Sequence, residues 1–70
     1  MRELPTLREL RMGKKFTQMQ MAEELRVTDK TYGAWERGFR TPKPSDMQKI
    51  EDYFNVPKED IFFEAFDYEK

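Results

Sequence analysis

The chain of 70 residues contains no cysteine and no histidine. Without cysteine there are no disulfide bridges, no thiolate metal sites and no cysteine nucleophile. Without histidine the chain lacks the commonest metal ligand and the commonest general base near neutral pH. No glycine-rich phosphate loop is present either. We therefore expect neither an enzyme nor a bound metal or cofactor.

Long apolar segments are also missing. The longest run of consecutive apolar residues is Ile61-Phe62-Phe63, whereas a helix needs about 20 apolar residues to cross a bilayer. The residues after Met1 are of mixed polarity and do not form the apolar core of a signal peptide. These features predict a soluble cytoplasmic protein with no membrane partner. We also expect no small-molecule ligand, because one short domain leaves no second domain for sensing a ligand.

Charge is distributed unevenly along the chain. Residues 1–49 hold eleven of the 13 basic side chains and seven of the 14 acidic ones. Residues 50–70 hold two basic and seven acidic side chains. The formal net charge of −1 therefore conceals a basic body, which can present an electropositive face to nucleic acid, and an acidic end.

Three capping boxes predict where helices begin. Thr6, Thr17 and Ser45 are each followed three residues later by Glu or Gln, so that each pair of side chains can satisfy free amides reciprocally. Thr28 is a further N-cap candidate without the reciprocal partner. Together with the apolar spacing, these signals predict an all-α fold of five short helices, at about residues 7–14, 18–25, 29–37, 46–54 and 58–63.

Glycine, asparagine and proline predict where helices stop. Gly38 and Asn55 are expected to end the third and fourth helices, because these residue types adopt left-handed conformations readily, and Gly13 is expected to loosen the end of the first helix. Pro42 and Pro44 are expected to keep residues 39–44 out of any helix. We expect one domain over residues 1–63, followed by an acidic, aromatic tail at residues 64–70.

Residues 18–37 form a pattern of helix, tight turn and helix. The small side chain of Ala22 lets the two helices cross closely, and Tyr32 and Trp35, three residues apart, are expected to face the core. The outer face of the second helix then carries Thr28, Asp29, Lys30, Gly33, Ala34 and Arg37. Short polar and basic side chains on an outward helix suit the DNA major groove, which is about 12 Å wide.

Residues 18–38, QMQMAEELRVTDKTYGAWERG, resemble the motif of the Cro/repressor-type (XRE) helix-turn-helix family of bacterial and phage regulators. The resemblance extends over residues 5–63. It implies a compact five-helix, lambda-repressor-like domain with the helix-turn-helix at its second and third helices. It also implies a sequence-specific transcriptional regulator, a repressor, that is encoded by a bacterium or a phage and binds double-stranded DNA in the cytoplasm.

The resemblance assigns roles to individual positions. Base reading falls to Thr28, Asp29, Lys30 and Ala34. Phosphate contacts fall to Gln18, Arg37, Arg40 and Lys43. Arg11 and Glu36 match the family's buried ion pair, which ties the first helix to the third. A palindromic operator is expected if the protein dimerises, and a homodimer through the C-terminal helix and tail is a further expectation.

Three positions depart from the family pattern. Arg26 stands where the turn usually has glycine, which predicts a non-glycine residue in a left-handed conformation. Gly33 weakens its helix by about 1 kcal/mol relative to alanine, and it either lets DNA approach closely or reflects relaxed DNA function. Asp29 would repel phosphates, although a carboxylate can accept a hydrogen bond from cytosine. Asp29, Gly33 and Ala34, together with the near-neutral net charge and the acidic, aromatic end, favour an alternative: a protein–protein interaction module on this scaffold with weak or no DNA binding.

Overall fold

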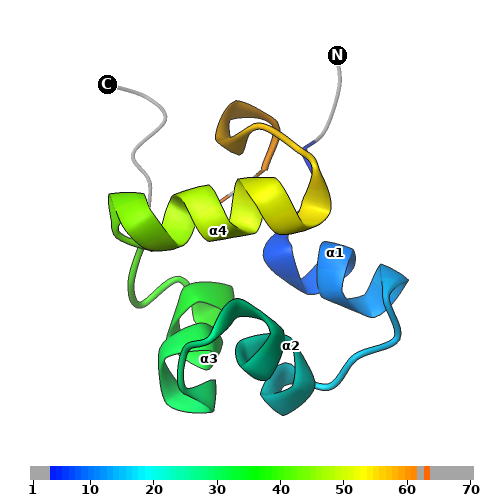
Figure 1. Ribbon diagram of the computed structural model, residues 1–70, viewed down its shortest axis with the longest axis vertical. Coiled ribbons are helices and arrows are strands. Elements are labelled where there is room, and N and C mark those ends of the chain that lie inside the picture. Colours follow the sequence, from blue (N-terminus) through cyan, green and yellow to red (C-terminus); the bar gives the residue numbers. More distant parts are fainter. Residues whose placement is uncertain (1–3, 62, 64–70) are drawn as a thin grey trace.

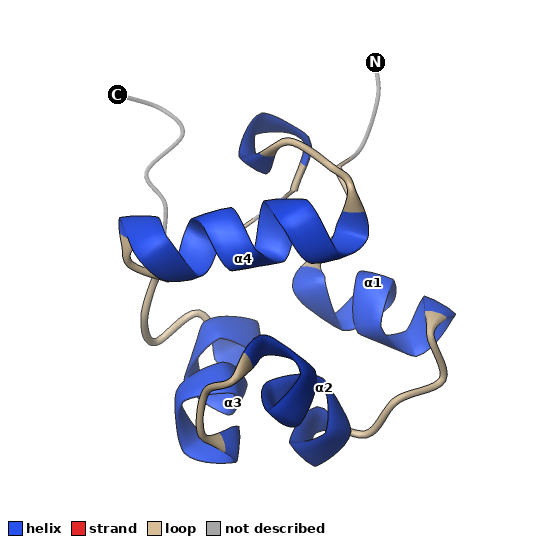
Figure 2. Ribbon diagram, in the orientation of Figure 1, coloured by secondary structure: helices blue, strands red, loops and turns tan. Residues whose placement is uncertain are grey.

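The computed structural model describes residues 4–61 and 63, and its regular structure there is helical throughout. Its elements are α1 (Leu7–Gly13), α2 (Gln18–Leu25), α3 (Asp29–Arg37), α4 (Pro44–Phe54) and the single 3₁₀ turn η1 (Lys58–Asp60). Helices α2 and α3 lie side by side, and α4 runs across them on one side (Figure 1). Short loops join the helices, and the described part contains no strand (Figure 2). The predicted all-α class is confirmed.

The fifth predicted helix is wrong. In place of a helix over residues 58–63, the chain makes one three-residue turn, η1. Ile61 then leaves the turn with extended backbone, at φ −120° and ψ 132°, and its side chain is fully buried. The straightened chain carries Ile61 into the core, so the turn does not continue as a helix. The tail at residues 64–70 lies outside the described residues.

Two capping boxes are formed as predicted. The Thr6 hydroxyl accepts from the backbone N–H of Glu9 at 3.1 Å, and the Glu9 carboxylate accepts from the backbone N–H of Thr6 at 2.9 Å. Thr17 and Gln20 repeat this arrangement at 3.1 and 2.8 Å. Thr28 caps α3 by accepting a single backbone hydrogen bond at 3.1 Å. The N-cap of each helix of the helix-turn-helix, α2 and α3, is therefore a threonine.

The predicted start of α4 is wrong. Its N-cap is Lys43, which makes no side-chain capping bond, and Pro44 is its first residue. Ser45 therefore lies inside the first turn and forms no capping box. The physical reason is that proline has a helical φ and no N–H group, so the first helical position, where that group would be unpaired, suits it. Residues 39–43 remain non-helical, as expected.

Left-handed residues end the helices, but not always where glycine stands. Gly38 (φ 80°) and Asn55 (φ 57°) follow α3 and α4 as predicted. Gly13, however, is the last residue of α1, and the left-handed residue after that helix is Lys15, at φ 62°. Arg26, at φ 60° and ψ 43°, confirms the expected left-handed turn after α2.

A single apolar core joins all the elements. Its buried members are Leu7, Met21, Ala22, Leu25, Tyr32, Trp35, Met47, Ile50, Ile61 and Phe63. Of two neighbouring methionines in α2, Met21 is fully buried and Met19 is 58% exposed. The Tyr32 and Trp35 rings meet edge to face at 5.9 Å. The inner faces predicted for α2 and α3 are therefore confirmed.

An ion pair inside the fold joins α1 to α3. The Arg11 guanidinium donates to the Glu36 carboxylate from Nε at 2.8 Å and from Nη2 at 3.3 Å. Its Nη1 donates to the carbonyl of Phe16 at 2.8 Å and so secures the loop between α1 and α2. The side chain of Glu36 is only 3% exposed. These contacts agree with the architectural role expected for Arg11 and Glu36.

The surroundings of Glu36 favour its ionised form. Burial alone would raise the pKa of Glu36, but the hydrogen bond from Arg11, assisted by the nearby Tyr32 hydroxyl and the Gln18 amide, outweighs burial and lowers it. Burial and the neighbouring carboxylate raise the pKa of the Tyr32 hydroxyl. Near neutral pH, therefore, Glu36 is charged and Tyr32 is neutral.

The left-handed turn at Arg26 predicts a stabilising substitution. Arg26→Gly relieves the clash between Cβ and backbone, and we expect it to raise the free energy of unfolding by about 1 kcal/mol. For a domain of this size that corresponds to a rise in Tm of roughly 4–8 °C in a thermal melt. Arg26→Ala is the matched control, because it removes the charge and keeps the strained backbone, so its Tm should not rise.

The ion pair predicts a destabilising substitution with its own pH dependence. Glu36→Gln leaves the Arg11 charge uncompensated, and we expect a loss of about 3 kcal/mol in urea unfolding. Because the pKa of Glu36 is lower in the folded protein than its ordinary value of 4.5, the wild-type pair stabilises the fold above that value. This contribution disappears as the pH falls through the folded-state pKa. Glu36→Gln should therefore flatten the decline in stability below pH 4.5.

An exposed glutamate in α2 provides the control for this experiment. Glu23→Gln changes the same chemical group at the surface and should alter stability by less than about 0.5 kcal/mol. Adding Arg11→Met to Glu36→Gln removes the stranded charge and should recover part of the loss. Equal effects of Glu36→Gln and Glu23→Gln would contradict the importance of the pair.

Candidate nucleic-acid interface

The turn between α2 and α3 sets the angle between the two helices. Arg26 reverses the chain, and the backbone N–H of Val27 then donates to the carbonyl of Ala22 at 3.0 Å. Val27 is half-buried and packs against the core. Ala22 is 2% exposed, and its small side chain allows the close approach of α2 and α3. The inner side of α3 is thereby fixed, and its outer side faces solvent.

The predicted base-reading residues lie on the outer side of α3. Asp29 and Lys30 are exposed in the first turn, and Ala34 is half-buried one turn later. Thr28 is exposed, but its hydroxyl already accepts from the backbone N–H of Thr31 and donates to the Thr31 hydroxyl at 3.0 Å. Its methyl group is the part free for an apolar contact. The base contacts of these four residues, Thr28, Asp29, Lys30 and Ala34, stay a prediction.

Gly33 lies on the same side of α3 as Arg37, as expected, but it is not exposed there. The residue is buried, because side chains from two helices cover it. A Cβ at this position would lie 3.1 Å from Nη1 of Arg37 and 3.6 Å from Oε1 of Gln18. The space that glycine leaves is therefore occupied by a guanidinium and an amide.

Two of the predicted phosphate-contacting residues border this space. Gln18, the first residue of α2, donates from Nε2 to Oε1 of Glu36 at 3.0 Å. Arg37, the last residue of α3, is exposed, and its Cζ lies 5.2 Å from the centre of the Phe39 ring. Gln18 thus has its amide nitrogen engaged inside the protein, whereas the Arg37 guanidinium faces solvent. Their phosphate contacts stay predictions.

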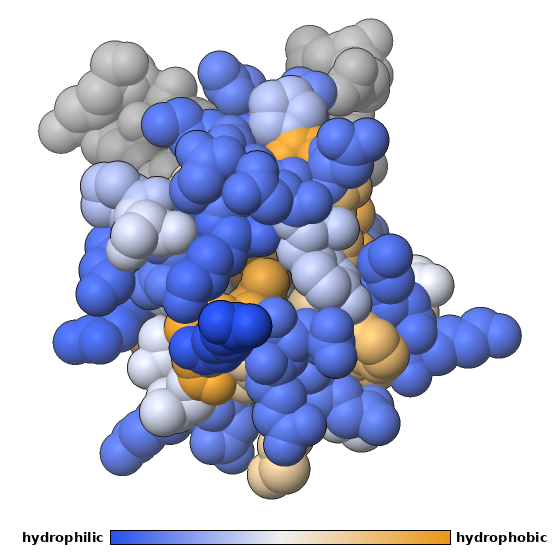
Figure 3. Space-filling model, viewed as in Figure 1, coloured by the Kyte–Doolittle hydropathy of each residue, from blue (hydrophilic) through white to orange (hydrophobic). Residues whose placement is uncertain are grey.

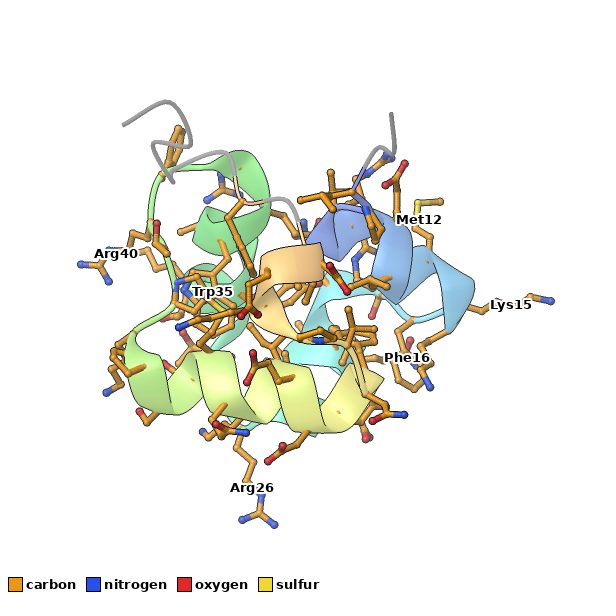
Figure 4. All side chains as sticks on the ribbon, turned by 90° about the horizontal axis from the view of Figure 1, so that it is seen from above. Met12, Lys15, Phe16, Arg26, Trp35 and Arg40 are labelled. Carbon is orange, nitrogen blue, oxygen red and sulfur yellow. The ribbon has the colours of Figure 1, made fainter. Side chains whose placement is uncertain are left out.

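The other two predicted phosphate-contacting residues, Arg40 and Lys43, lie in the loop after α3. They line a surface hollow that we call the basic hollow. Its volume is about 570 Å³, and it is lined by Arg26, Val27, Thr28, Thr31, Trp35, Arg40, Thr41, Lys43, Asp46 and Lys49. Arg26 and Arg40 point away from the body of the molecule, while Trp35 lies between α3 and α4 (Figure 4). Asp46 is 8% exposed and lies 3.5 Å from the Lys49 ammonium.

Arg26 and Lys49 were missed by the sequence reasoning as members of this site. The α2–α3 turn supplies Arg26 and α4 supplies Lys49, so only the tertiary fold brings them to one hollow. The available signal in the sequence was the excess of basic over acidic residues within residues 1–49. This excess does not show which basic side chains come together in the fold. Four basic side chains and one carboxylate around the hollow make it a region of positive potential.

The surface shows few other chemical features. Hydrophilic residues predominate on the face drawn in Figure 3. Among the described residues, no group of three or more acidic, cysteine or histidine side chains could hold a metal ion. No helix in this part of the chain is both long enough and apolar enough to cross a membrane.

Comparison with known proteins agrees with this geometry. The family model described as Helix-turn-helix matches residues 7–61, which include α1 to α4 and η1. Comparison with curated proteins and with solved structures gives no match. The matched span covers most of the chain and contains the α2–turn–α3 unit. This protein belongs to the Cro/repressor-type (XRE) helix-turn-helix family of DNA-binding regulators.

Proposed function

We propose that this protein is a sequence-specific transcriptional regulator, a repressor, that reads the major groove of double-stranded DNA with α3. The observation that carries the proposal is the division of α3 into two sides. Tyr32 and Trp35 are buried against the rest of the domain, whereas Asp29 and Lys30 are exposed at the N-terminal end. A helix about 10–12 Å across fits a groove of about 12 Å.

Direct reading of bases would depend on few side chains. Lys30 can donate to guanine O6 and N7, and Asp29 can accept from cytosine N4. Thr28 and Ala34 can add apolar contacts to thymine methyl groups. With so small a reading surface, the shape and deformability of the operator would supply part of the specificity.

Phosphate contacts would hold the domain in register on the duplex. Arg37 and Gln18 lie together where α3 passes the first residue of α2. Arg40 and Lys43 line the basic hollow after α3. Contacts of this kind position a protein on DNA and make its affinity depend on salt, but they carry no base sequence themselves.

Dimerisation on a palindromic operator is part of this proposal. A two-fold dimer of this kind of domain binds half-sites whose centres are about 34 Å apart. The C-terminal tail proposed for the dimer contact begins at Glu64 and lies outside the described residues.

Selection of duplexes from a randomised library tests the proposed function. Folded protein should enrich an inverted repeat at both low and near-physiological salt, because base contacts add to the phosphate contacts. A single enriched half-site would support base reading and contradict the dimer. No enrichment at either salt would overturn the regulator and favour a protein–protein interaction module on the same scaffold.

Two substitutions should separate base reading from phosphate contact. On the selected operator, Lys30→Ala should cost about 1–3 kcal/mol and remove the preference at one base position. Arg40→Ala should weaken binding to all sequences alike and lower the slope of log affinity against log salt by about 1. Titrations of selected and random duplexes over a range of salt concentrations measure both effects.

Lys58→Ala is the matched control. Lys58 is an exposed lysine in η1, on the far side of α4 from α3 (Figure 1), and its removal should leave affinity and salt slope unchanged within about twofold. If Lys30→Ala weakened selected and random duplexes equally, Lys30 would not be a base-reading residue.

A further inference from the structure

Gly33 occupies a position in α3 where its backbone does not require glycine. Gly38 is the one glycine among the described residues with a positive φ, and Gly33 lies inside the regular helix. Alanine would fit this backbone and favour the helix, because glycine loses more conformational freedom on folding. What distinguishes glycine at this position is therefore the absence of a Cβ atom, which leaves space beside the helix.

That space is filled by Arg37. Its Nη1 lies 3.1 Å and its Cζ 3.8 Å from the place where a Cβ of residue 33 would be. The first distance is tighter than an ordinary contact, so a methyl group at residue 33 would press the guanidinium outward by a few tenths of an ångström. The position of Arg37 against α3, which we call its seat, is thus sensitive to a side chain at residue 33.

Two residues lie near this seat. Phe39 places its ring 5.2 Å from Cζ of Arg37, within the range of a cation–π contact. Phe39 is 74% exposed, so this contact is made at the surface. Oε1 of Gln18 lies 3.6 Å from the same Cβ position of residue 33, and Nε2 of Gln18 donates to the buried Glu36 carboxylate. Through Gln18, the surroundings of Gly33 are connected to the core ion pair.

We propose that Gly33 is a positioning residue, which leaves room for the Arg37 guanidinium to lie against α3, where it meets one backbone phosphate of the operator. This inference rests on the proposed function. It differs from the simpler idea that glycine lets the DNA backbone approach α3, because in our proposal Gly33 acts only through Arg37. Pre-organisation of a long side chain raises affinity because less freedom is lost on binding.

A double-mutant cycle tests the proposal, with the duplex selected by the wild-type protein as the probe. Gly33→Ala should weaken binding roughly 3- to 10-fold and lower the salt slope, since one charge-assisted contact is misplaced. The same substitution should raise Tm by roughly 4 °C, because alanine favours the helix. In the Arg37→Ala background, Gly33→Ala should raise Tm and leave affinity unchanged.

The outcomes of the cycle are distinct. Equal losses of affinity in both backgrounds would overturn the proposal and mean that DNA approaches Gly33 directly. No loss in the wild-type background would also overturn it. If the wild-type protein bound no duplex even at low salt, the proposed function would fail together with this inference. If the wild-type protein bound the duplex but Gly33→Ala had the same effect on affinity in both backgrounds, only this inference would be rejected.

Phe39→Leu provides a second variant that leaves the helix intact. Leucine keeps apolar bulk but has no aromatic face, so the seat of Arg37 should loosen and affinity should fall about 2- to 5-fold. In the free protein, the NMR shifts of the Arg37 side chain should lose the ring-current contribution of Phe39. An unchanged affinity for Phe39→Leu would contradict the part of the seat assigned to Phe39.

Discussion

A carboxylate enclosed in an apolar core is stable only where donors surround it, and Glu36 meets this condition through Arg11 and Gln18. Arg11 comes from α1, Gln18 from α2 and Glu36 from α3. One buried group therefore fixes three helices relative to one another, and its donors also hold the loop after α1. The orientation of α3, and with it the surface that we propose faces DNA, depends on this network.

Local signals in the sequence were sufficient where a single side chain acts on its own backbone. Thr6 and Thr17 begin helices as predicted, and Gly38 and Asn55 end them. The prediction for Ser45 failed because Pro44 competes for the start of the same helix. The family resemblance indicated the pairing of Arg11 with Glu36. Burial of Gly33 was not predictable, since it depends on how Arg37 and Gln18 fold across it.

The candidate interface combines a sparse reading surface with well-fixed surroundings. Asp29 and Lys30 are the charged side chains exposed in the first turn of α3, whereas Ala34 offers only a methyl group. Around them, basic side chains arrive from the α2–α3 turn, the loop after α3 and α4 itself. The excess of positive charge on this side offsets the acidic end of the chain, so a near-zero net charge and a DNA-binding face are compatible.

Lys15, Arg26 and Asn55 all hold left-handed backbone. For a lysine or arginine this conformation costs about 1–2 kcal/mol, a large share of the roughly 5–15 kcal/mol by which domains are stable. A chain of 70 residues that accepts such costs visits its unfolded state more often, and proteases attack that state. Glycine in place of Lys15 and Arg26 would remove this cost, so these two turns keep the folded form closer in free energy to the unfolded form than the fold itself requires.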